Sequence, residues 1–170
     1  MIKYKNILLI IFFFFSILNS SYSSEKISFL DMEHVVKSSD AGKKILDKIK
    51  KINENNVEIL KEKELKLKKI EENIKKKQNI LSKEELDKEI IKLRIQVNNL
   101  RTEKDDMVKN VNKIKNKELK KLYKQINPII QSYMDKNNIT ILLDMKNIIA
   151  GKTNSNITND IIDEINKNIN

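Results

Sequence analysis

The six residues Leu81-Ser82-Lys83-Glu84-Glu85-Leu86 interrupt a stretch that runs from residue 43 to residue 124 without proline or glycine. Ser82 and Glu85 have the spacing of a capping box, in which each side chain accepts a hydrogen bond from the other residue's backbone N–H at the start of a helix. The apolar periodicity of the stretch also lapses here. These two signals together predict that one helix ends near Leu81 and that a second one begins at the capping box.

Apolar residues recur on both sides of this break at the three- and four-residue spacings of a helix face. Before it they are Ile45, Ile49, Ile52, Ile59, Leu67, Ile70, Ile74 and Leu81. After it they are Leu86, Ile90, Leu93, Val97, Leu100, Met107, Val111 and Ile114, with Lys104 as the one polar exception. The second run predicts a heptad seam. Two such helices joined by a tight turn form an antiparallel hairpin with arms of roughly 55–65 Å. One unbroken helix is the alternative, which the capping box disfavours.

The first 23 residues have the three parts of a secretory signal peptide. Lys3 and Lys5 form a positive head, residues 7–18 form an apolar run, and small polar residues follow. The run is shorter than the ~20 residues that cross a bilayer, which disfavours the alternative of an uncleaved anchor. We expect cleavage after Ser23 and export to the periplasm. The chain has no cysteine, so it carries no disulfide there and no lipid anchor at the cut.

The segments that flank the arm, residues 24–42 and 125–170, predict a small body. Lys26–Asp31 alternates as a strand does, with Ile27 and Phe29 on one face, and Asp31 then caps a short helix. Asn127-Pro128 indicates a fresh helix start or a kink.

Two further strands are expected near the C-terminus, at Ile139–Asp144 and at Asn147–Gly151, before Thr158 caps a last helix. Pairing of the N-terminal strand with these C-terminal strands gives one small sheet from which the hairpin arm of residues 43–124 projects. The fold class is therefore α+β and mainly α. Because about 60 residues make a marginal core, we expect an oligomer to complete the body.

The positive charge is concentrated on the arm. The chain has a net charge of +10, and residues 43–124 hold 26 basic against 15 acidic residues, whereas acids outnumber bases in both flanking segments. A basic arm suggests nucleic acid. However, the protein is exported, only Phe29, Tyr123 and Tyr133 are aromatic after residue 23, and only Arg94 and Arg101 are arginines. Polypeptides of negative net charge, anionic lipid and lipopolysaccharide are the better candidates.

The composition also excludes most catalytic sites. The 170 residues include two glycines and one histidine, His34. There is no thiol nucleophile, no Cys/His metal cluster and no glycine-rich phosphate loop. His34 has no second ligand near it in sequence, so a packing or surface role is expected for it. We predict no enzymatic activity, no metal and no cofactor.

Short motifs distributed over residues 26–158 resemble the Skp/OmpH family of periplasmic chaperones for outer-membrane proteins. Their order and spacing carry the resemblance more than any one of them does. They are Lys26-Ile27-Ser28-Phe29-Leu30-Asp31-Met32, Ser38-Ser39-Asp40-Ala41-Gly42-Lys43-Lys44, Leu81-Ser82-Lys83-Glu84-Glu85-Leu86, Ile126-Asn127-Pro128-Ile129-Ile130, Ile141-Leu142-Leu143-Asp144 and Asn156-Ile157-Thr158. Asp40 stands where the family usually has proline, and Asn156 replaces an aspartate.

The resemblance implies a homotrimer in which strands of each subunit form a central β body and three helical hairpins hang from it. Unfolded outer-membrane proteins are held between the hairpins without ATP. A lipopolysaccharide site has been proposed in the family, and its residues are not assigned to this chain.

From charge and position we expect client attraction at Lys61, Lys63, Lys66, Lys68, Lys69, Lys75, Lys76 and Lys77. We expect the core or trimer contacts at Ile27, Phe29, Ile141, Leu143 and Ile148. A structural or adaptor coiled coil that binds a folded partner is the alternative function.

Overall fold

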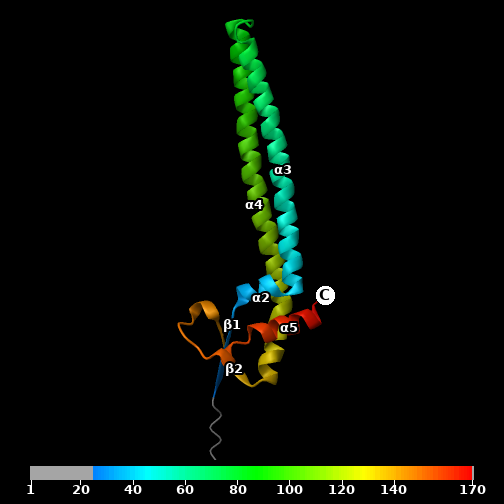
Figure 1. Ribbon diagram of the computed structural model, residues 1–170, viewed down its shortest axis with the longest axis vertical. Coiled ribbons are helices and arrows are strands. Elements are labelled where there is room, and N and C mark those ends of the chain that lie inside the picture. The colour runs from blue at the N-terminus through cyan, green and yellow to red at the C-terminus, as the bar shows by residue number, and fades with distance from the viewer. Residues whose placement is uncertain (1–24, 170) are drawn as a thin grey trace, which may run out of the picture.

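The computed structural model describes residues 25–169, so the predicted signal peptide lies outside the described residues. Two long helices, α3 (Asp40–Lys77) and α4 (Lys83–Lys136), lie side by side as a rod that projects from a small body (Figure 1). The body holds β1 (Lys26–Leu30), α2 (Met32–Ser38), β2 (Ile139–Asp144), two short 3₁₀ turns, η1 (Met145–Asn147) and η2 (Thr153–Ser155), and α5 (Thr158–Asn168). Among the described helices, none is long and apolar enough to cross a membrane.

The predicted capping box is confirmed at the turn between α3 and α4. The Glu85 N–H donates to Ser82 Oγ at 3.3 Å, and the Ser82 N–H donates to Glu85 Oε2 at 3.0 Å. The two helices are therefore an antiparallel hairpin, as predicted, and not one unbroken helix. At 1.5 Å per residue, α3 is about 57 Å long.

A glycine makes the corner between α2 and α3 possible. Ser39 caps α3 by accepting a hydrogen bond from the Gly42 N–H at 3.3 Å. A Cβ added at Gly42 would lie 1.8 Å from the carbonyl oxygen of Val36. Only a residue without a side chain lets the chain reverse this closely onto α2, and the corner aims α3 out of the body.

The core of the body joins the two ends of the chain. Its buried apolar residues are Leu30, Val35, Val36, Ala41, Leu122, Ile126, Ile139, Ile157, Ile161, Ile162 and Ile165. β1 and β2 pair in parallel with Ile27 opposite Ile141 and Phe29 opposite Leu143, so the predicted pairing of N-terminal and C-terminal strands is confirmed. Because α4 contributes Leu122 and Ile126, the arm and the body share this core.

The third predicted strand, Asn147–Gly151, is wrong, and the sheet has two strands within the described residues. Asp144 accepts a hydrogen bond from the Lys146 N–H at 2.9 Å and thereby starts η1. The chain then passes over the ring of Phe29, where a Cβ on Gly151 would lie 2.6 Å from Phe29 Cε1. This turn and close crossing replace the extended pairing that the apolar residues suggested.

A fresh helix start at Pro128 is also wrong, since α4 continues through Pro128 to Lys136. An internal proline costs a helix about 3 kcal/mol because it removes one hydrogen bond and crowds the preceding turn. Ile126 is fully buried before it, and Ile130 and Met134 pack against the same core after it. Core packing on both sides of Pro128 therefore keeps the helix continuous.

Thr158 does not cap its own helix, contrary to the sequence-based expectation, because it is the first residue of α5. Its hydroxyl donates to Asn156 Oδ1 at 2.6 Å and accepts from the Asp31 N–H at 2.9 Å. The Asp31 side chain in turn accepts from the His34 N–H at 2.9 Å and caps α2, as predicted. Thr158 thus connects the start of α5 to the end of β1.

Truncation of the core should show how far this packing stabilises the body. We expect Ile161→Ala, at a fully buried position, to lower the free energy of unfolding by about 2–5 kcal/mol. Ile80→Ala is the matched control, because Ile80 is 81% exposed at the turn, and it should change stability by less than about 0.5 kcal/mol. Urea unfolding followed by far-UV circular dichroism measures both; equal costs would contradict the assigned core.

Tyr133 makes the stability of the body depend on pH in alkaline solution. Burial, together with a 2.8 Å hydrogen bond donated by its hydroxyl to Asp160, raises the pKa of Tyr133 to about 12 from its ordinary 10.0. The folded chain therefore favours the neutral phenol, and stability present below pH 10 is lost as the pH rises toward 12. The difference in phenolate absorbance between wild type and Tyr133→Phe should show a midpoint near 12. A midpoint near 10 would contradict this contact.

Candidate functional site

The seam between α3 and α4 is built largely from the predicted apolar residues. On α3 the half-buried ones are Ile45, Ile49, Ile52, Ile59, Leu67, Ile70 and Ile74. On α4 they are Leu86, Leu93, Leu100, Met107, Val111 and Ile114. These side chains use one stripe of each helix, so the remaining surface of both helices stays available for contacts with other molecules.

The strict heptad predicted for α4 is wrong at two positions. Ile90 and Val97 are 39% and 45% exposed, and Gln96 and Glu103 are half-buried in their neighbourhood. A strict seven-residue repeat drifts by about 20° per heptad around a straight helix. Toward the body, successive inward-facing residues of α4 are four positions apart, from Ile114 through Glu118 and Leu122 to Ile126. The buried face therefore rotates around the helix along its length.

Two ion pairs cross the seam and fix its register. Lys63 on α3 pairs with Glu103 on α4, and Lys48 pairs with Glu118 at 3.0 Å. The residue numbers of both pairs add to the same total, so one antiparallel register holds along the hairpin. The hydrogen bond that Lys48 donates lowers the pKa of the Glu118 carboxyl, and the charge of Lys121, whose Nζ lies 3.6 Å from Glu118 Oε2, lowers it further.

The structure places the predicted client-binding lysines in two environments. Lys63 is half-buried in the seam with Glu103, so its charge is largely neutralised. The exposed ones are Lys61, Lys66, Lys68, Lys69, Lys75, Lys76 and Lys77. Lys75, Lys76 and Lys77 share the last turn of α3, where Lys75 also pairs with Glu71 at 2.7 Å. The predicted lysines that stay exposed therefore lie on the outer half of α3, toward the tip of the arm.

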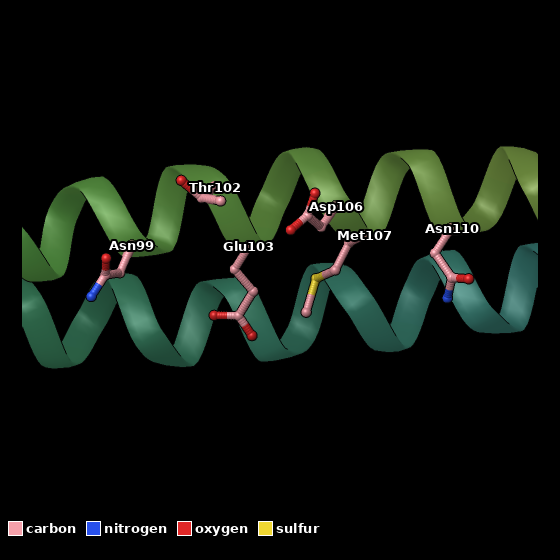
Figure 2. A pocket seen from close by; sticks show the side chains of 6 residues that line it. All are labelled: Asn99, Thr102, Glu103, Asp106, Met107 and Asn110. Atoms are coloured by element: carbon pink, nitrogen blue, oxygen red, sulfur yellow. The ribbon is translucent and has the colours of Figure 1, made fainter.

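A groove of about 560 Å³ runs beside the seam in the middle of the arm. It is lined by Asn99, Thr102, Glu103, Asp106, Met107 and Asn110. Figure 2 shows Glu103 and Met107 pointing from α4 toward α3, with Asn99 and Asn110 at the two ends. Glu103 forms an ion pair with Lys63, and Asp106 forms one with Lys109, whose Nζ lies 3.5 Å from Asp106 Oδ1.

The groove's side chains thus suit polar contact and not proton transfer. Sequence periodicity missed Gln96 and Glu103 as seam residues, because polar residues carry no apolar signal. Within residues 25–169, no group of three His, Asp or Glu side chains could hold a metal ion.

Four of the five predicted core or trimer residues, Ile27, Phe29, Ile141 and Leu143, lie on one side of the two-stranded sheet. Ile27, Ile141 and Leu143 are 48%, 39% and 42% exposed. Phe29 is buried beneath Gly151, and Ile148 is half-buried. Ser28 and Leu30 point to the opposite side, into the subunit's own core. An apolar sheet face is therefore open in a single subunit.

Comparison with known proteins identifies relatives of this fold. The profile of a family described as outer membrane protein (OmpH-like) matches residues 26–165. A solved structure of a candidate OmpH-like outer membrane chaperone from Caulobacter crescentus superposes with a TM-score of 0.78. The two chains are 18% identical, and the match covers 86% of this chain and 87% of the other. A search of curated proteins finds no match.

The Lys63–Glu103 pair can be tested by exchanging its charges. Glu103→Lys places two cations together in the half-buried seam and should lower stability by about 1 kcal/mol. Adding Lys63→Glu restores an ion pair of opposite polarity and should recover most of that loss. Thermal unfolding of the two single variants and the double variant completes the cycle. Additive effects would show that the two side chains do not interact.

Proposed function

The chain belongs to the OmpH-like outer membrane protein family, and from this premise we propose that it is an ATP-independent holdase chaperone of the periplasm. In this proposal three subunits hold an unfolded outer-membrane protein between their arms and prevent its aggregation. The observation that carries the proposal is the projecting hairpin. About 57 Å of two-helix arm buries a single seam and leaves its remaining surface, with most of the positive charge, open to a partner.

Trimerisation is proposed from the open sheet face of the body. A two-stranded sheet is marginal on its own, and Ile27, Ile141 and Leu143 leave apolar surface exposed on one side of it. Burial of such surface against two other copies would stabilise the body. Three arms would then project from one base and enclose a space between them.

Client capture is proposed to use many weak contacts. Unfolded barrel strands expose apolar side chains and unpaired backbone groups that aggregate by edge pairing. The exposed lysines toward the tip attract acidic clients over a range set by ionic strength. Aliphatic side chains on the outside of the arm, among them Val57, Leu65, Ile95 and Val108, are 52–58% exposed. They would supply the short-range contacts that hold a client after electrostatic encounter.

The test of the proposed function is light scattering from an unfolded outer-membrane protein diluted out of urea, without ATP, at low and high salt. The mature chain should suppress scattering at about three subunits per client, and less strongly in high salt. Suppression that is indifferent to salt would remove the electrostatic part. No suppression would contradict the holdase and favour an adaptor that binds a folded partner.

Charge reversal at the tip should weaken client binding. We expect Lys75→Glu, Lys76→Glu and Lys77→Glu together to raise the Kd for an acidic unfolded client about tenfold at low salt, because attraction becomes repulsion. The mass of the assembly should not change, since the tip is far from the body (Figure 1).

Lys113→Glu, Lys117→Glu and Lys120→Glu together are the matched control, with the same change in charge near the base of the arm. Equal losses in both triple variants would show that net charge, and not the tip, determines binding.

A further inference from the structure

One face of α4 carries a mixed line of three aliphatic and three cationic side chains. Its members follow one another at steps of four, three, four, three and four residues, which keeps them on one line along a helix. We call this line the α4 stripe, and it consists of Ile90, Arg94, Val97, Arg101, Lys104 and Val108. The stripe is about 27 Å long, and it contains both arginines of the chain.

The side chains of the stripe are available to a partner. Ile90, Val97 and Val108 are 39%, 45% and 54% exposed, and the three cations are exposed as well. No salt bridge or side-chain hydrogen bond engages Arg94, Arg101 or Lys104 within residues 25–169, although Asp105 follows Arg101 by four residues. Of the other cations of α4, Lys88 pairs with Glu84 and Lys109 with Asp106. Lys92, Lys113 and Lys117, like the stripe cations, form no ion pair in the part of the chain that the structure describes.

The opposite flank of α4 has another chemistry. There the groove of Figure 2 presents the amides of Asn99 and Asn110, the hydroxyl of Thr102 and the carboxylate of Asp106. Those side chains offer neither free cations nor a continuous aliphatic surface. Over residues 99–110, α4 therefore has a cationic, aliphatic flank and a neutral to acidic one, on the two sides of the same seam. Beyond the groove, exposed Lys92, Lys113 and Lys117 continue the second flank.

The stripe suits an extended acidic chain. Arginine binds carboxylates in a two-pronged geometry that lysine lacks, and its stem covers apolar surface while the charge stays in water. Arg94 and Arg101 are about 10.5 Å apart along the helix axis. Acidic residues two or four positions apart on one face of an extended strand are about 7 and 13 Å apart, a range that flexible arginine side chains span.

We propose that the α4 stripe is the surface on which the arm holds acidic, aliphatic segments of unfolded polypeptide in extended form. Barrel strands alternate apolar and polar residues, so a strand with acids at its polar positions supplies both kinds of partner along its length. This inference rests on the proposed function and makes it more specific. It adds one flank of α4 to the surfaces proposed for short-range contacts and gives the protein a preference for acidic strands.

The experiment uses the mature chain and two labelled peptides with the alternation of a barrel strand, one with glutamate and one with lysine at the polar positions. Fluorescence anisotropy at low salt gives the Kd. The stripe variant is Arg94→Gln, Arg101→Gln and Lys104→Gln together. The control variant is Lys92→Gln, Lys113→Gln and Lys117→Gln together, which removes the same charge from exposed lysines on the other side of α4. Circular dichroism and assembly mass verify folding of both.

We expect the stripe variant to bind the acidic peptide about tenfold more weakly, from three lost charge contacts, and the control variant to change the Kd less than twofold. The wild type should prefer the acidic peptide to the basic one. If both variants lose affinity for the acidic peptide equally, or if neither loses any, the proposed role of the stripe is overturned.

The stripe variant is also tested for binding to anionic phospholipid vesicles. If it binds the vesicles more weakly than the wild type does but binds both peptides equally well, the proposal is overturned and the stripe binds lipid instead. The proposed function fails separately, when the wild type does not suppress aggregation of an unfolded outer-membrane protein at all.

Discussion

The narrow seam between α3 and α4 is the constraint on which the rest of the molecule depends. It buries one stripe of each helix, and the Ser82–Glu85 capping box and the Lys48–Glu118 pair fix where the chain reverses and in which register it returns. Because so little of each helix is buried, a large exposed surface extends tens of ångströms from the body. Without the shared core at Leu122 and Ile126, this hairpin would have no fixed direction, since α4 belongs to both arm and body.

Short sequence motifs correctly predicted the structural elements that depend only on neighbouring residues. The capping box, the Asp31 cap and the strands around Phe29 and Ile141 each depend on a few neighbouring residues, and the structure contains all of them. Contacts distant in sequence were not predictable in the same way. Thr158 bonds to the Asp31 N–H, 127 positions away, and the sequence alone suggested that it would cap its own helix.

The seam shows the same division between local and distant causes. Apolar spacing identified most of its members, but the strict heptad placed Ile90 and Val97 inside it, although the drift of the buried face leaves them exposed. Apolar periodicity does not predict the Lys63–Glu103 pair. Because of this pair, one of the lysines predicted to bind clients makes a contact within the arm instead. The displaced Ile90 and Val97 are two of the three aliphatic members of the α4 stripe, so the same drift contributes to the proposed binding surface.

In this account the body assembles the subunits and the arms hold the client. Native mass spectrometry of the mature chain, mixed with one unfolded outer-membrane protein without ATP, measures both parts at once. We expect a free species of three chains and a complex of three chains with one client. A single chain under the same conditions, or three chains that never retain a client, would contradict it.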